Sequence, residues 1–301
     1  MSHIRSLKFI TFCIAAYAIL FLFSVFFQSS TTGQNFDNLY FFKLIVMFLI
    51  AEPHFAFTIP LLVGYKEQFT KRPIEFKVIP LIIIATGSIL FFYSMTLFAF
   101  IFLFANIYHV NRQSLGFFKL QARASVTLNA TYEPLLHGFT LFFFLTRLIE
   151  TNFSERLIFF GCFLIALIIL GWYLFKEAKE DKWLKICSYT QGFMIFLPVA
   201  VFEDILLAFA IGIAIHYIQY MVISWLICRN SFNFPYYNLL LIVLLYATLT
   251  SSALGGFITQ ENQSLIIFIP TILQFLHFYF DGFLWRRDNE DVALVIKKGL
   301  A

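Results

Sequence analysis

Long apolar runs separated by short polar stretches constrain this chain more than any other feature of its sequence. A helix needs about 20 apolar residues to cross the hydrocarbon core of a bilayer, and such runs follow one another through most of the 301 residues. Only 13% of the residues are charged, against roughly 25% in a soluble domain. The sequence therefore predicts an all-α, polytopic transmembrane helix bundle that forms a single domain over residues 1–301. The predicted spans are 7–27, 40–64, 78–93, 95–118, 132–150, 157–175, 186–202, 205–228, 237–257 and 264–286.

Two of the apolar stretches are too long for one span each, and polar residues mark where they divide. The stretch 78–118 is expected to divide near Tyr93 and Ser94. The stretch 186–228 is expected to divide at Glu203 and Asp204, because two adjacent carboxylates are costly at membrane depth. With both divisions the bundle has about ten helices, and an even number of spans places both termini on one side.

The distribution of basic residues tests this topology independently. Most of them fall in the loops of one side, whereas only Lys43, Arg147 and Arg156 fall on the other. This bias follows the positive-inside rule, so both termini and the loop 176–185 are predicted in the cytosol, with the bundle in an inner (cytoplasmic) membrane. Because the basic residues lie in these short loops, we expect membrane lipid and no nucleic acid as a partner.

Most histidines lie within predicted spans, where ionisable side chains are costly and usually functional. They are His54, His109, His137, His216 and His277. Counted from the cytosolic end of each span, all but His137 lie about 9–12 residues deep, which places these four within about 5 Å of one level. Helix bundles build metal sites from side chains that meet in this way. We therefore predict that His54, His109, His216 and His277 are metal ligands, although a buried histidine in a membrane bundle also commonly serves only to hydrogen-bond across helices.

Polar residues accompany these histidines, most of them at helical spacing. Asp281 follows His277 by four residues, and so shares its helix face. It is expected either to orient that imidazole or to bind the metal directly. The residues predicted to bond to the ligands and orient them are Asp281, Gln113, Gln219, Tyr220, Glu52 and Glu133. The residues predicted to line a substrate cavity are Tyr108, Tyr217, Tyr279, Asn106 and Gln274.

Two further ionisable residues within spans have ordinary interpretations. His137 is shallower than the other histidines, and Glu133 precedes it by four residues, so the two are expected to pair near the interface. Arg112 is expected either to extend to the cytosolic interface or to hold an anionic head group. The sequence leaves that choice open.

The four predicted histidine ligands limit which metals and reactions the site can support. Neutral imidazoles suit Fe, Zn, Cu or Ni. The zinc hydrolase motif HExxH is absent, as are the HxxxH and HxxHH boxes typical of membrane desaturases. Two bis-histidine haems normally stack at two depths, whereas these four histidines share one. The sequence therefore favours a single non-haem Fe(II) site, with Zn, Cu or haem as alternatives.

The order of the histidines resembles that of the Brp/Blh-type membrane β-carotene cleavage dioxygenases. The family's successive motifs resemble Pro53-His54, His109, His216 and His277 with Asp281. This resemblance implies a helix bundle with one iron held by histidines. Phe55 departs from the small residue expected after the first histidine, and Tyr220 stands where a paired HxxxH motif has its second. The sequences around His109, His216 and His277 also resemble a set of bacterial multi-pass membrane proteins, and that likeness implies no function.

The sequence thus predicts a metal-dependent membrane oxygenase, an oxidoreductase of the dioxygenase kind. Because no charged groove crosses the chain and its aromatic residues are mostly Phe, the substrate is expected to be lipophilic: a carotenoid, another isoprenoid or an acyl chain. A second hypothesis is a non-enzymatic transporter or lipid-binding assembly protein, which an interrupted helix at Pro53, 129–134 or 255–256 would favour. A third is a bis-histidine haem protein of electron transfer.

Overall fold

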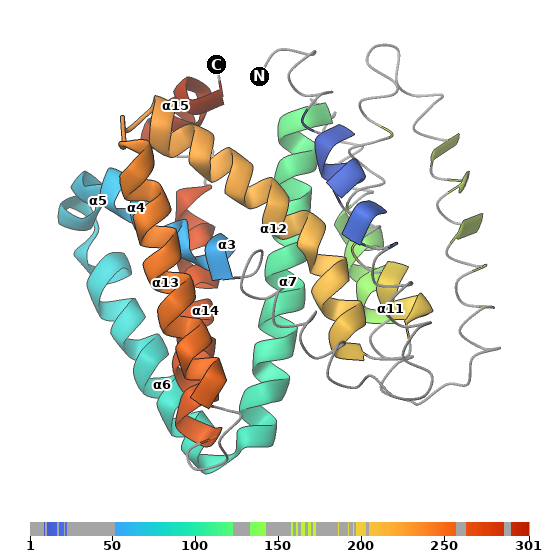
Figure 1. Ribbon diagram of the computed structural model, residues 1–301, viewed down its shortest axis with the longest axis horizontal. Helices are drawn as coiled ribbons and strands as arrows, with labels where there is room; N and C mark the ends of the chain where they lie inside the picture. Colours follow the sequence, from blue (N-terminus) through green and yellow to red (C-terminus); the bar gives the residue numbers. More distant parts are fainter. Residues whose placement is uncertain are drawn as a thin grey trace. The chain divides into compact units, whose positions relative to one another are not determined.

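In the computed structural model of the chain, every regular element among the described residues is a helix (Figure 1). The predicted all-α class is therefore confirmed for this part of the chain. The chain divides into two compact units, one of residues 1–46 and 110–218 and one of residues 47–109 and 219–301. The described residues are 52–122, 133–142, 197–202, 205–256, 263–285 and 290–300, with isolated residues and short runs within 9–22, 158–172 and 186–195.

The second unit, which we call the histidine unit, contains most of the described helices. Two long helices, α7 and α12, continue from it into the other unit. In chain order its elements are α3 (Glu52–Ala56), α4 (Thr58–Gly64), α5 (Lys66–Lys71), the π-helix η2 (Ile74–Val78), α6 (Ile79–Tyr93), α7 (Met95–Ala122), α12 (Ile205–Asn230), α13 (Tyr236–Gly256), α14 (Gln263–Leu284) and α15 (Glu290–Leu300).

Helix boundaries in the described residues lie close to those predicted. The long stretch 78–118 divides as expected, because α6 ends at Tyr93 and Ser94 takes an extended conformation (φ −155°, ψ 99°) before α7 begins. In the other long stretch, α11 (Leu197–Val201) ends shortly before α12 begins at Ile205. Glu203 and Asp204, the predicted dividing point, lie outside the described residues. The predicted spans 7–27, 157–175 and 186–202, the start of 40–64 and the ends of 132–150 fall wholly or largely outside them too.

Helices α3 and α4 form a nearly continuous helix with one loosened turn. The N–H of Phe57 donates to the carbonyl oxygen of Pro53 at 3.2 Å, and the N–H of Leu61 donates to that of Phe57 at 3.4 Å. Phe57 itself keeps helical angles (φ −64°, ψ −18°). The turn before Pro53, where that proline would interrupt a helix, lies outside the described residues. Helical periodicity carries from His54 to Thr58, which share one face.

The helices of the histidine unit pack through apolar and small residues. Helix α14 packs against both α6 and α13, and α3 packs against α13 (Figure 1). Phe91, Phe98 and Ile272 form a buried cluster between α6, α7 and α14. Gly87 allows a close approach there, since a Cβ at its position would lie 2.5 Å from Cδ1 of Ile272. This packing holds α14 beside the helices that carry the other site residues.

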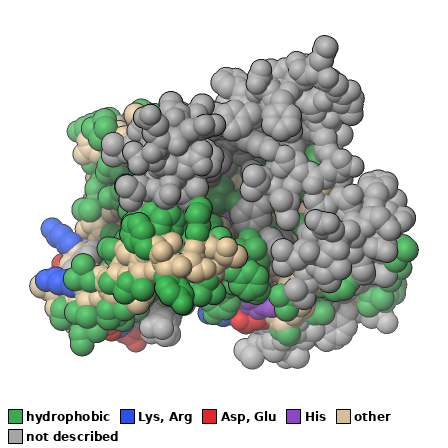
Figure 2. Space-filling view, turned by 90° about the horizontal axis from the view of Figure 1, so that it is seen from below, with side chains coloured by type: hydrophobic (Ala, Val, Ile, Leu, Met, Phe, Trp, Pro, Cys, Tyr) green, Lys and Arg blue, Asp and Glu red, His purple; other side chains and the backbone are tan. Residues whose placement is uncertain are grey.

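Apolar side chains also cover much of the outer surface. Among the described residues, the two stretches Ile74–Tyr93 and Ile211–Asn230 are long and apolar enough to cross a membrane. On α6, Leu81, Ile89 and Phe92 are exposed at roughly helical spacing. Figure 2 shows one face of the molecule, on which hydrophobic side chains make up most of the described surface and charged side chains are few.

Candidate metal centre

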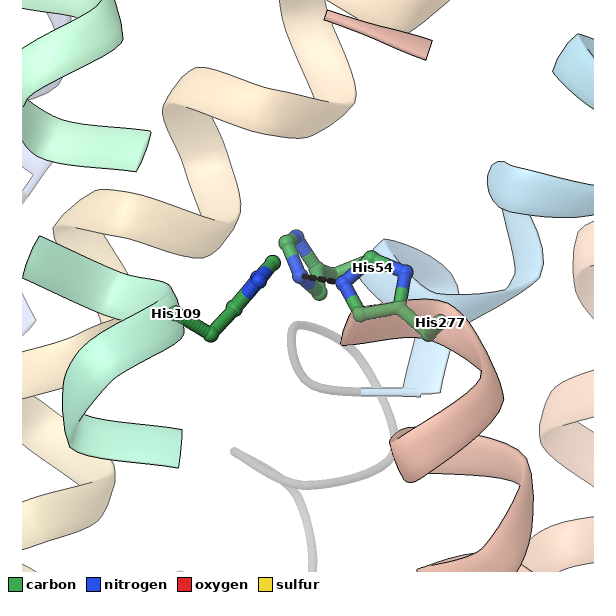
Figure 3. Close-up of side chains that lie close together, drawn as sticks. All are labelled: His54, His109 and His277. Carbon is green, nitrogen blue, oxygen red and sulfur yellow. Dashed lines mark hydrogen bonds between the residues drawn. The ribbon is translucent and has the colours of Figure 1, made fainter. Parts of the chain in front are cut away.

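Three buried histidines from three helices meet in the histidine unit. His54 lies on α3, His109 on α7 and His277 on α14, and the rings point toward one another (Figure 3). Their exposed fractions are 0%, 8% and 2%. One ring nitrogen of each lies within 4.8 Å of those of the other two. This arrangement of three buried imidazoles could hold a metal ion.

The separations between donor atoms are close to those that a shared metal requires. Metal–imidazole bonds of about 2.1 Å allow two donors to be at most about 4.2 Å apart. Nε2 of His54 and Nε2 of His277 are 2.9 Å apart, the spacing of two neighbouring ligands at an angle near 90°. The largest separation in the triad, 4.8 Å at most, exceeds the limit by only about 0.6 Å. A shift of that size in one nitrogen would bring the pair to the limit, which corresponds to two ligands on opposite sides of the ion.

The 2.9 Å contact also has a metal-free interpretation, and it argues against a haem held between His54 and His277. Without a metal, it is a hydrogen bond between the two Nε2 atoms of His54 and His277, drawn dashed in Figure 3. A haem iron would need its two axial nitrogens on opposite sides, about 4.2 Å apart with the porphyrin between them. His54 and His277 are too close to serve as such a pair.

Aspartate and hydroxyl groups complete the polar cluster. Oδ2 of Asp281 lies 3.7 Å from Nε2 of His277 and 3.8 Å from Nε2 of His109. The hydroxyl of Tyr220 donates to Oδ1 of Asp281 at 2.8 Å. Oγ1 of Thr58 lies 3.2 Å from that hydroxyl and 2.5 Å from Nδ1 of His277. Asp281, Tyr220 and Thr58 are all buried, so the whole cluster is removed from water.

Aromatic rings surround the imidazoles. The Phe278 ring stacks on His109 at a centroid distance of 4.6 Å. The Phe55 ring lies edge-on to both His54 and His277, at 5.0 Å from each. Such a wall limits solvent access and lowers the local dielectric constant, which strengthens the interaction of a cation with its ligands. Phe55, a departure from the family that the sequence resembles, is thus part of the wall.

The remaining predicted histidines lie in the other unit. His216 is fully buried on α12, with its ring 5.6 Å from that of Tyr217. Its predicted role as a ligand stays a prediction. His137 shares a hydrogen bond with the side-chain amide of Asn111, which joins Nδ1 of His137 to Nδ2 of Asn111 at 3.1 Å. The amide oxygen of the same Asn111 accepts from Thr140 at 3.1 Å.

Glu133 has a partner that the sequence interpretation did not give it. Its carboxylate accepts a hydrogen bond from Nη1 of Arg112 at 2.8 Å, and the Arg112 side chain is 52% exposed. Both residues belong to the unit that contains His137. Arg112 therefore has an internal counter-ion, which neither of the two predicted roles included.

The other predicted residues are distributed more widely. Glu52 is buried on α3 and lies beside Thr250 of α13. Tyr279 donates its hydroxyl to the backbone oxygen of Glu75 at 2.9 Å and so ties α14 to η2. Tyr108 is 60% exposed on α7. Asn106, Gln113, Gln219 and Tyr217 are buried, and Gln274 is partly buried.

Thr58 is the site residue that sequence reasoning missed. It follows His54 by four residues in the α3–α4 helix and therefore shares its face. The same spacing identified Asp281 from His277. A search for hydroxyl groups one turn after each histidine would have found it.

Comparisons with protein-family models, with curated proteins and with solved structures found no match for this chain. The resemblance to the Brp/Blh-type dioxygenases therefore rests on the order of the histidines. What the site does must follow from its own donor atoms, burial and surroundings.

Proposed function

We propose that this protein is a metal-dependent membrane oxidoreductase that holds non-haem iron on His54, His109 and His277 and acts on a long apolar lipid. The observation that carries this proposal is the convergence of three buried imidazoles, from three helices, within 4.8 Å. Three imidazoles are a donor set that suits iron, zinc, copper or nickel. Among these, Fe(II) with open coordination positions supplies dioxygen chemistry.

The surroundings of the site support an apolar substrate. The rings next to the histidines are Phe55, Phe278 and Tyr220. Apart from Asp281, none of the groups described in contact with the three imidazoles carries a formal charge. The Phe rings of this lining offer a charged, water-soluble substrate no compensation for the hydration that it would lose here. The apolar part of a carotenoid, another isoprenoid or an acyl chain has no charged group whose hydration would be lost.

The outer surface supports a bilayer as the source of that substrate. On α13, Tyr237, Leu241 and Leu244 are exposed at helical spacing, as the apolar residues of α6 are. Exposed apolar rows on two helices are typical of a surface that meets a membrane or a partner. The proposed protein is a bundle of about ten spans in an inner membrane with both termini in the cytosol. Exposed Lys66, Lys71, Lys77, Lys297 and Lys298 would then face the cytosolic surface.

The test begins with metal content. Wild type and the variants His54→Ala, His109→Ala and His277→Ala are purified without oxygen and examined by elemental analysis. The expected result is stoichiometric iron in wild type and loss in each variant, because each imidazole supplies one of few bonds. His137→Ala is the matched control, since His137 bonds to Asn111 in the other unit. His216→Ala decides whether the predicted fourth histidine contributes.

The second step is dioxygen consumption with a carotenoid, an isoprenoid alcohol or a long-chain fatty acid presented in detergent. The iron-loaded wild type should consume dioxygen with one of these lipids, and His277→Ala should not. Wild type that binds no metal would contradict the proposal and would return the protein to the transporter or lipid-binding class. Iron found only as haem would favour electron transfer instead.

A further inference from the structure

The Asp281 carboxylate faces the side of His277 on which a metal would bind. A carboxylate that merely oriented this imidazole would meet the nitrogen turned away from the metal. That nitrogen, Nδ1, already lies 2.5 Å from Oγ1 of Thr58. Asp281 instead directs Oδ2 toward Nε2 of His277 and Nε2 of His109, at 3.7 and 3.8 Å. Both distances are below the ~4.2 Å limit for two donors on one ion.

We propose that Asp281 is a ligand of the same metal, binding through Oδ2 alone, and that Tyr220 and Thr58 are the residues that position it and His277. This inference rests on the metal site of the proposed function, and it is independent of the reaction and of the substrate. It gives the ion three imidazole nitrogens and one carboxylate oxygen.

Tyr220 explains why only one carboxylate oxygen is offered. Its hydroxyl donates to Oδ1 at 2.8 Å, and its ring packs 4.3 Å from the His54 ring and 5.7 Å from the Trp285 ring. Tyr220 is fully buried, so its hydroxyl bonds to groups of the protein. Oδ1 is thereby held by the protein, and Oδ2 remains directed at the two Nε2 atoms.

Counting protons along the hydrogen bonds fixes the form of His277. With Asp281 ionised as a metal ligand, the hydroxyl proton of Tyr220 is given to its carboxylate, so Thr58 is the donor in its contact with Tyr220. The single proton of Thr58 is then used, and its oxygen must accept from Nδ1–H of His277. A neutral imidazole with its proton on Nδ1 has a free electron pair on Nε2. Thr58 and Tyr220 thus hold His277 in the tautomer that binds a metal through Nε2.

The buried carboxylate also gives the site a charge that suits a divalent cation. Asp281 is 5% exposed, and an isolated carboxylate at such a position is strongly disfavoured unless a cation or hydrogen bonds compensate it. A dication supplies that compensation. Mixed imidazole and carboxylate ligands favour divalent ions such as Fe(II), Mn(II) and Zn(II) over Cu(I), which prefers sulfur.

The experiment measures metal affinity and the ligand set without using activity. Metal-free protein is titrated with Fe(II) under anaerobic conditions and, in parallel, with Co(II), whose visible spectrum changes with the atoms bound to it. The variants are Asp281→Asn, Tyr220→Phe and Thr58→Val, with Thr58→Ser as the conservative rescue. Tyr279→Phe is the matched control, because this tyrosine is on α14 two residues before Asp281 but donates to the backbone of Glu75.

We expect Asp281→Asn to weaken Fe(II) binding by more than about 100-fold, since it removes a ligand and not only an orienting contact. It should also change the Co(II) spectrum. Tyr220→Phe and Thr58→Val should weaken binding by about 10–100-fold, whereas Thr58→Ser and Tyr279→Phe should match wild type.

An Asp281→Asn protein that binds Fe(II) within about 10-fold of wild type, with an unaltered Co(II) spectrum, would overturn the assignment. If that variant does not fold, Asp281→Glu is compared with the double variant Tyr220→Phe/Asp281→Ala. Asp281→Glu keeps a carboxylate, so it should retain more metal than the double variant. Equal loss of metal in both would overturn the assignment. The same titration distinguishes failure of the histidine site from failure of the Asp281 assignment. If the histidine site is wrong, His54→Ala and His277→Ala bind metal as wild type does.

Discussion

Metal binding should stabilise the folded protein, because the three histidines belong to helices far apart in the sequence. His54, His109 and His277 lie on α3, α7 and α14, and an unfolded chain does not hold them together. A ligand that binds only the folded state stabilises it by about 2.7 kcal/mol when its free concentration is 100 times its Kd. We expect this increment in the free energy of unfolding of metal-free wild type when Fe(II) is added at that excess.

The variant that tests the reasoning is His109→Ala. Its ring stacks on Phe278 at 4.6 Å, so truncation removes packing and destabilises the protein even without metal. The informative quantity is therefore the difference between unfolding with and without Fe(II), measured for each protein in the same detergent. Loss of one imidazole raises the Kd, so the same Fe(II) concentration no longer reaches about 100 times that value. If the Kd rises about 100-fold, the metal-dependent increment in the free energy of unfolding falls to about 0.4 kcal/mol.

The assay is chemical or thermal unfolding followed by tryptophan fluorescence, under anaerobic conditions. His137→Ala should keep the full metal-dependent increment, because His137 is bonded to Asn111 in the other unit. An increment of equal size in wild type and in His109→Ala would refute the reasoning, since the metal would then bind somewhere other than this triad.

Two further predictions concern topology and packing. Reporter fusions at residues 180 and 301 should both report the cytosol, and fusions on opposite sides would rule out the ten-span topology. Gly212→Ala should prevent stable folding, because its Cβ would overlap the backbone oxygen of Ile195. Gly116→Ala should unfold like wild type, because its Cβ would have no described atom within 4 Å apart from its chain neighbours and the backbone of its own helix. Equal stability of the two variants would contradict the close approach at Gly212.

Helix boundaries were accessible from the sequence because they depend on local chemistry. The division at Ser94 follows from polarity at the end of an apolar run, and the structure places α6 and α7 on either side of that residue. Likewise, the four-residue spacing of His277 and Asp281 places them on one helix face in any α-helix. Depth along each span brought His54, His109 and His277 to one level, and the structure brings these three together.

Contacts between helices depend on the rotation of each helix about its axis and on rotamers, which periodicity leaves open. Neighbouring residues in a helix point about 100° apart around its axis, so Tyr108 is exposed although His109 beside it is buried. Partners are shared in the same way: Glu133 is one turn from His137 and its charge acts on that imidazole, but it accepts a hydrogen bond from Arg112 of α7.

The sequence by itself predicted the all-helical class, the helix ends seen in the described residues and the three histidines that meet, because each of these follows from residue type and spacing along the chain. Only the tertiary structure decided which donor faces which. It turned Oδ2 of Asp281 toward the Nε2 atoms and gave Nδ1 of His277 to Thr58. The physical reason is that these contacts join α4, α7 and α14, and the packing of those helices sets the position of each donor.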